Sequence, residues 1–209
     1  MAEVITTAPK SKEAEVKLLI MPLGELTSRL GDDEASTAIK AIANFVNRRR
    51  PGDKQMLPVS DADIAGKYTD FVALRLPEAE DIIDASFITN NVVGYVGAMK
   101  PIRHGARLMS EVGSLKVDDS LRGHGVGTIL FERIIKAMQD EGITPYAFCN
   151  SDSLPIAKRL GGREIESADE VPPEALELCQ ECPLYGQGSK KHGCCDTVMV
   201  WNKTQNADG

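Results

Sequence analysis

The spacing of hydrophobic residues predicts a domain in which strands and helices alternate. Apolar runs of strand length occupy residues 16–23, 108–117 and 143–149. Apolar residues recur at helical spacing over residues 33–48, and again from Leu130 to Met138, with Gly142 placed to end that second helix. Such alternation is typical of a sheet covered by helices.

Residues 1–14 show no periodicity, and we expect them to form a flexible tail that packs little. The remaining segments carry weaker patterns. The expected elements are a helix at 61–76, a turn or short helix at 77–84, two strands within 86–100 joined by an asparagine turn at 89–91, a turn at 101–105, a helix at 151–160, and strands at 163–165 and 197–201.

Composition indicates one soluble domain, which we place at residues 15–204. The 209 residues are 42% hydrophobic and 26% charged, and no apolar run reaches the roughly 18 residues that a membrane helix needs. The N-terminus lacks a signal-peptide pattern, so we expect a cytoplasmic protein with no membrane partner. A net charge of −7 argues against nucleic-acid binding, which favours a positive surface.

A glycine-rich loop separates the strand at 108–117 from the helix around Leu130. The order strand, loop, helix places backbone N–H groups at the positive end of a helix dipole, where phosphate binds. Glycines allow a phosphate to approach these amides, and an arginine adds a charged contact. The residues of this candidate anion site are Arg122, Gly123, His124, Gly125, Val126, Gly127 and Thr128.

The type of loop narrows the ligand. A dinucleotide fingerprint beginning at Gly123 would need glycine where Thr128 stands, and the Gly-Lys-Ser/Thr triplet of a P-loop is absent. The remaining pattern, R-x-x-G-x-G, resembles the acetyl-CoA loop of the GNAT acetyltransferases, and residues 115–130 are similar to that family's motif A. Asn150 and Gly161 fit the positions of its motif B.

The resemblance covers about residues 92–201 and implies a fold and a reaction. The fold would be α/β with a central mixed, splayed sheet of about six or seven strands flanked by helices. The reaction would transfer an acetyl group from acetyl-CoA to a primary amine, on a small molecule, a protein lysine or an N-terminus, by direct attack on the thioester. The resemblance also implies coenzyme contacts through the backbone of Leu115, Lys116 and Val117, and through Asn150.

The catalytic residues are less clearly marked. Glu111, eleven residues before Arg122, lies where the histone-acetylating branch of the family carries its general base, although a strand glutamate facing solvent would look the same. Ala157 occupies the position of the usual tyrosine acid, which leaves Ser153, Tyr146 and Cys149 as candidates. The alternative is an inactive GNAT-fold binding or structural module that is stabilised by a zinc-stapled insertion. Some proteins encoded by bacteriophages look like this.

Four cysteines crowd into residues 168–196, which we expect to form an insertion before the last strand. Cys179 and Cys182 form a C-x-x-C pair, and Cys194 and Cys195 follow after an eleven-residue spacer. In a reducing cytosol this spacing favours a structural zinc site over disulfides or free thiols. Because adjacent residues on an extended chain point to opposite sides, His192 could replace one of the last two cysteines.

Overall fold

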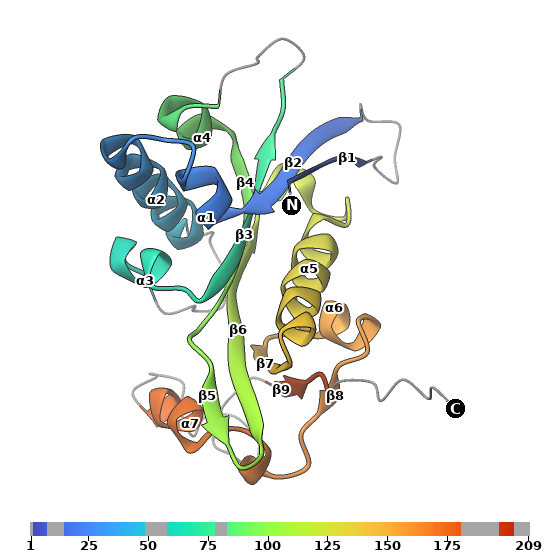
Figure 1. Ribbon diagram of the computed structural model, residues 1–209. Helices are drawn as coiled ribbons and strands as arrows, with labels where there is room; N and C mark the ends of the chain where they lie inside the picture. Colours follow the sequence, from blue (N-terminus) through green and yellow to red (C-terminus); the bar gives the residue numbers. More distant parts are fainter. Residues whose placement is uncertain (1, 8–14, 49–57, 78–82, 181–196, 203–209) are drawn as a thin grey trace. The chain divides into compact units, whose positions relative to one another are not determined.

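A computed structural model describes residues 2–7, 15–48, 58–77, 83–180 and 197–202 (Figure 1). The chain divides into two compact units. The first unit consists of Met1–Ala98 and Ser114–Ile134, and the second of Met99–Gly113 and Ile135–Gly209. The chain therefore crosses between the units more than once, and one strand and one helix each contribute residues to both.

The first unit is built on antiparallel strands. β2 (Val16–Pro22), β3 (Thr69–Arg75) and β4 (Val92–Ala98) pair in that order, and β1 (Glu3–Thr7) adds an edge next to β2. Every residue of β4 is buried, as expected for a strand covered on both faces. The predicted strand at 16–23 is confirmed.

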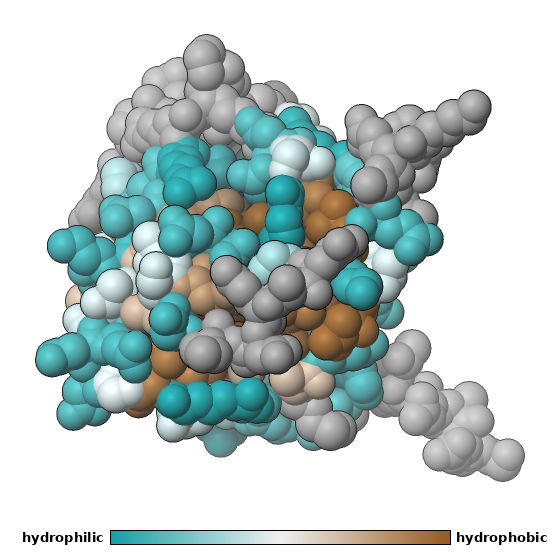
Figure 2. Space-filling view, turned by 90° about the horizontal axis from the view of Figure 1, so that it is seen from above, coloured by the Kyte–Doolittle hydropathy of each residue, from teal (hydrophilic) through white to brown (hydrophobic). Residues whose placement is uncertain are grey.

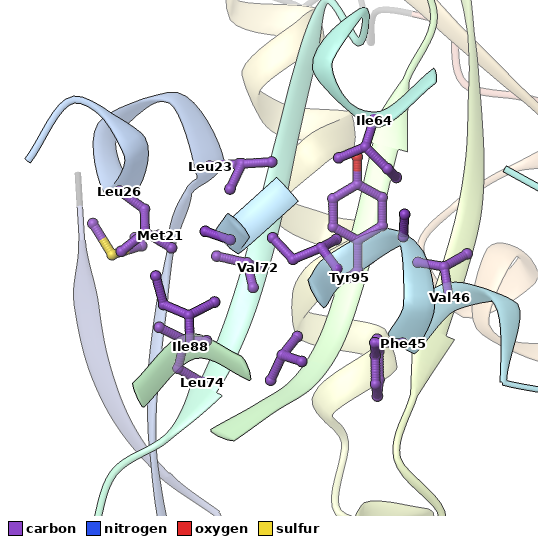
Figure 3. Packing of buried hydrophobic residues seen from close by; sticks show 14 of the residues in the cluster. Met21, Leu23, Leu26, Phe45, Val46, Ile64, Val72, Leu74, Ile88 and Tyr95 are labelled. Carbon is purple, nitrogen blue, oxygen red and sulfur yellow. The ribbon is translucent and has the colours of Figure 1, made fainter. Parts of the chain in front are cut away.

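Four helices cover one face of β2, β3 and β4 (Figure 1): α1 (Leu23–Thr27), α2 (Asp32–Asn47), α3 (Asp61–Ala65) and α4 (Ala85–Asn91). Their apolar side chains form one cluster with the strands, in which the Tyr95 ring of β4 points toward Ile64 of α3 (Figure 3). On the opposite face Gly94 lies against Leu130 of α5 (Val126–Asp140). The core of this unit therefore has two layers of helix around one sheet.

The second unit contains a mixed sheet. β6 (Arg107–Val117) pairs antiparallel with β5 (Ile102–His104) and parallel with β7 (Ile143–Cys149). β9 (Thr197–Val200) pairs antiparallel with both β7 and β8 (Arg163–Glu164). The helices α6 (Leu154–Arg159) and α7 (Pro173–Gln180) belong to this unit, together with the C-terminal part of α5. The predicted mixed α/β fold with a mixed, open sheet flanked by helices is confirmed.

Several local expectations were wrong. Residues 3–7, expected in a flexible tail, form β1, paired with β2 from Glu3–Ile20 to Thr7–Val16. The helix expected at 61–76 ends at Ala65, and β3 follows. Residues 85–91 form α4 rather than a strand, capped by the Asp84 carboxylate, which accepts a hydrogen bond from the Phe87 amide at 2.7 Å. The described residues also hold nine strands, more than predicted, because β1, β3 and β5 were not expected, whereas β8 matches the strand expected at 163–165.

Hydrophilic side chains occupy much of the surface seen in Figure 2, with smaller hydrophobic areas between them. Among the described helices, none combines the length and the apolar character that a bilayer crossing requires.

Candidate functional site

The glycine loop lies between β6 and α5 in the first unit, and a short 3-10 turn, η1 (Asp119–Leu121), leads into it. Asp118 caps this turn, because its carboxylate accepts hydrogen bonds from the Ser120 amide at 3.0 Å and the Ser120 hydroxyl at 2.6 Å. Gly123 and Gly125 have φ of 81° and 82°, which side chains rarely adopt. A Cβ at either glycine would meet no atom within 4 Å, so the loop presents bare backbone to open space.

The start of α5 offers hydrogen-bond donors. The Ile129 amide makes the first bond of the helix, to the Gly125 carbonyl at 3.0 Å. The amides of Val126, Gly127 and Thr128 come before that bond and have no carbonyl partner within the helix. No acidic residue stands in the first turn of this 15-residue helix, so its positive end is not already neutralised by a carboxylate of its own. The geometry suits an anion.

Two arginines contact the η1 turn that leads into this loop. Arg122 is exposed and lies 3.9 Å from the Asp119 carboxylate. Arg75, at the end of β3, donates from Nη2 to the Ser120 hydroxyl at 2.8 Å, whereas its buried Nε has no hydrogen-bond partner among the described residues. Burial works to raise the pKa of Asp118, but the Ser120 hydrogen bonds and the charges of Arg75 and Arg48 outweigh it and lower that pKa. Asp118 therefore stays ionised and holds the turn.

Packing holds α5 close to the sheet of the first unit. A Cβ on Gly94 would stand 2.8 Å from the Leu130 side chain and 3.1 Å from the Ala73 Cβ. Only glycine allows this approach, and the approach sets where the N-terminus of α5 lies. The predicted backbone contacts Leu115, Lys116 and Val117 are half-buried at the end of β6, and the Lys116 ammonium donates to the Arg48 carbonyl at 2.8 Å.

Glu111, the predicted base, lies on the part of β6 that belongs to the second unit. It is half-buried and stands directly opposite Tyr146 in the parallel β6–β7 pair. Tyr146 is only 2% exposed. Burial, followed by the charges of Glu111 and Glu174, raises the pKa of the Tyr146 hydroxyl above its ordinary value. The strand register thus brings together two candidates that the sequence could not connect.

The motif B residues also lie in the second unit. The Asn150 side-chain oxygen accepts from the amides of Asp152 at 2.9 Å and Ser153 at 3.1 Å, and from the Ser153 hydroxyl at 3.3 Å. This oxygen therefore shapes the turn before α6, which leaves the side-chain NH₂ for other contacts. Cys149 is buried in β7, and Ala157 is fully buried in α6.

Sequence reasoning missed the role of Trp201. A Cβ on Gly162 would lie 2.8 Å from the Trp201 ring, and the ring nitrogen donates to the Leu160 carbonyl at 3.0 Å. The indole therefore occupies the space beside residue 162.

The cysteine cluster falls mostly outside the described residues. Cys179 belongs to α7, whereas Cys182, His192, Cys194 and Cys195 lie beyond the described ranges. Within those ranges, no group of three or more His, Cys, Asp or Glu side chains is arranged to hold a metal. The zinc site stays a prediction.

A comparison with known protein families gives a match. The sequence model of the acetyltransferase (GNAT) family matches residues 51–161, more than half of the chain. No curated protein matches the sequence significantly.

Two solved structures share the fold. Rv2747 from Mycobacterium tuberculosis, in complex with CoA and NLQ, has 18% identity and a TM-score of 0.50, covering 79% of this chain and 93% of its own. Arabidopsis thaliana NAA60, in complex with acetyl-CoA, has 12% identity and a TM-score of 0.51, covering 88% and 97%. The two structures show the fold alone, whereas the match to the sequence model decides membership: the chain belongs to the acetyltransferase (GNAT) family.

Proposed function

We propose that the protein is an acetyl-CoA-dependent N-acetyltransferase that acts on a primary amine. The observation that carries this proposal is the start of α5, where amides without helical partners follow two glycines whose surroundings are open. Family membership supports acetyl transfer, and one of the two similar structures contains acetyl-CoA while the other contains CoA.

The loop from Arg122 to Thr128 would hold the coenzyme pyrophosphate. The amides of Val126, Gly127 and Thr128 would donate to phosphate oxygens, with the helix dipole and the Arg122 guanidinium adding positive charge. The bare backbone at Gly123 and Gly125 would let the phosphates approach. The backbone of Leu115, Lys116 and Val117 and the side-chain NH₂ of Asn150 would then contact the pantetheine arm.

The reaction needs a neutral amine, because an ammonium has no lone pair with which to attack. Glu111 would accept a proton from the acceptor, after which the amine nitrogen bonds to the thioester carbonyl carbon and the carbon–sulfur bond breaks. Because the pKa of Tyr146 is raised, its hydroxyl keeps its proton and suits hydrogen-bond donation better than proton transfer to a thiolate. The buried Ala157 offers no hydroxyl for that step.

Calorimetric titration with acetyl-CoA tests the coenzyme site. Arg122→Ala should weaken binding by about 1 to 3 kcal/mol if the guanidinium contacts the pyrophosphate. Lys40→Ala removes a cation from an exposed position of α2 and serves as the matched control, with no expected change. Equal affinities for the two variants and the natural protein would contradict the assigned loop.

Thiol release from acetyl-CoA over a panel of amines tests turnover. We expect release that depends on the amine and falls strongly in Glu111→Gln, because glutamine cannot accept the proton. Coenzyme binding without release for any amine would instead support an inactive GNAT-fold module.

The cysteines carry a separate proposal, a structural zinc ion held by Cys179, Cys182, Cys194 and Cys195, with His192 as the alternative to one of the last two ligands. Four thiolates are the ligand set of a closed structural zinc site. We expect about one zinc per chain in protein purified under reducing conditions. A metal content near zero would exclude the site.

A further inference from the structure

The pairing of β6 with β7 ends partway along both strands. Its last pair joins Glu111 to Tyr146, although both strands continue beyond these residues. Two residues further along each strand stand Gly113 and Phe148, which no pairing joins among the described residues. Residues two apart on a strand share a face, so Gly113 and Phe148 lie on the face of Glu111 and Tyr146. The strands therefore stop pairing immediately after the proposed base.

Gly113 leaves room beside that base. A Cβ at this position would meet a single atom within 4 Å among the described residues, Oε1 of Glu111 at 3.5 Å. The half-buried Phe148 ring lies edge-on to the Tyr146 ring, with 6.3 Å between the centroids, and it does not come within 4 Å of that Cβ position. The absent side chain thus leaves a space next to the Glu111 carboxylate, on the same face as an aromatic ring.

Neither the backbone nor the packing requires glycine here. Gly113 is not among the glycines with positive φ, and the irregular residue of this strand is its neighbour Ser114, with φ of 57°. The nearest atom to an added Cβ is at an ordinary contact distance. A glycine weakens a strand, and one without a structural reason often marks a place where a ligand approaches closely. The space is therefore available to a substrate.

The proposed reaction indicates which part of the substrates comes close to Gly113. Glu111 takes the proton of the attacking amine, and Leu115 is the first of the backbone contacts to the pantetheine arm. The thioester carbonyl, which reacts between amine and arm, then lies between these two positions along β6. Gly113 is midway, roughly 7 Å along the strand from each. The acyl chain beyond the carbonyl carbon would therefore lie beside Gly113.

We propose that the space at Gly113 admits acyl groups longer than acetyl, so that the enzyme also transfers propionyl and butyryl groups from their CoA thioesters. This inference rests on the proposed function. The added methylenes would contact the Phe148 ring. The amine nitrogen bonds to the carbonyl carbon as the carbon–sulfur bond breaks, and an ammonium and butyryl-CoA give the butyramide, the free thiol of CoA and one proton.

The test compares acyl donors on one folded protein, so that changes in stability cancel. Amine-dependent thiol release is measured with acetyl-CoA, propionyl-CoA and butyryl-CoA, and mass spectrometry identifies the amide product. In the natural protein kcat/KM for butyryl-CoA should lie within about tenfold of the acetyl-CoA value. Gly113→Ala should lower the butyryl-to-acetyl ratio about tenfold and Gly113→Val further, because each added carbon takes the space of an acyl methylene.

Gly24→Ala is the matched control, because a Cβ on Gly24 of α1 also meets no neighbouring side chain within 4 Å. It should leave the butyryl-to-acetyl ratio unchanged, and an equal fall in this variant would overturn the assignment to Gly113. Should Gly113→Val fail to fold, Gly113→Ala decides, because its Cβ makes only the 3.5 Å contact with Glu111.

The outcomes separate this inference from the proposed function. If amines are acetylated but neither propionyl-CoA nor butyryl-CoA is used, the longer-chain activity is overturned while the acetyltransferase activity stands. If butyryl-CoA is used and the ratio is the same in both Gly113 variants as in the natural protein, the space at Gly113 is not where the chain lies. If none of the three thioesters releases thiol with any amine, the proposed function fails and this inference fails with it.

Discussion

Asp70 is a carboxylate buried in the first unit, and its ionisation should oppose folding. It is 8% exposed, on β3, and accepts a hydrogen bond from the Tyr95 hydroxyl at 3.0 Å. Burial raises its pKa from 3.8 to about 6, although the Tyr95 hydrogen bond, a hydrogen bond from the Leu23 backbone and the Lys67 charge act in the other direction. Figure 3 shows the ring of Tyr95, its hydrogen-bond partner, among apolar side chains.

The sign and size of the effect follow from linkage. A carboxyl group whose pKa is higher in the folded protein than in the unfolded chain binds its proton more tightly when folded. Its stabilising contribution is therefore complete below pH 3.8 and is lost as the pH rises through about 6. At about 1.4 kcal/mol for each pKa unit, the gap corresponds to about 3 kcal/mol of unfolding free energy.

Asp70→Asn removes the titration and keeps an oxygen that can accept from Tyr95. Urea unfolding of both proteins between about pH 4 and pH 8 gives the difference in their unfolding free energies at each pH. From pH 4 to pH 8 the unfolding free energy of the variant, relative to that of the natural protein, should rise by about 3 kcal/mol. Most of this rise should occur between pH 4 and 6. Asp61→Asn, at an exposed position of α3, is the control. A difference for Asp70→Asn that stays constant with pH would refute the reasoning.

Three further substitutions test local packing and backbone conformation, each by urea unfolding. Gly94→Ala should destabilise the protein by about 1 to 3 kcal/mol, because the added Cβ would press on Leu130 and Ala73, whereas Gly24→Ala meets no atom within 4 Å and controls for the loss of glycine. Ser114→Gly should stabilise by up to about 1 kcal/mol, because Ser114 has φ of 57°; no gain would indicate that its side chain compensates for the strain. Gly162→Ala should cost about 1 to 3 kcal/mol through contact with the rigid Trp201 ring, and an unchanged midpoint would show that the ring can move away.

The elements that the sequence predicted well are those whose signals are local. The stripe from Leu130 to Met138 and the stop at Gly142 need only the period of a helix and one residue with positive φ, and Gly142 has φ of 77°. The glycine loop is recognisable because its residues act through backbone geometry rather than through distant partners. The motif therefore predicted the family, and the family model confirms it.

The errors lie where tertiary contacts decide. Residues 86–91 contain phenylalanine, isoleucine and threonine, which favour strands, but the Asp84 cap and the burial of Phe87 and Ile88 against the cluster make them helical. Residues 3–7 form a strand because β2 presents an edge that pairs with them, and no pattern within five residues reports a distant edge. The same reason hid Trp201, which lies forty-one residues from the carbonyl it contacts.

In the candidate site, the strand β6 likewise combines features that local sequence predicts with features that it does not. Alternation along β6 would place Glu111, Gly113, Leu115 and Val117 on one face, but Ser114 adopts a left-handed conformation that interrupts the alternation. The Glu111 carboxylate lies 3.5 Å from the position of a Cβ on Gly113, so these two residues do share a face before the irregularity. Beyond Ser114, the face on which each side chain lies is known from contacts such as that of Lys116 with the Arg48 carbonyl. The sequence could therefore name the residues of the coenzyme site and of the base separately. It could not predict which residues of β6 share a face, because that depends on the φ of Ser114, which no sequence pattern predicts.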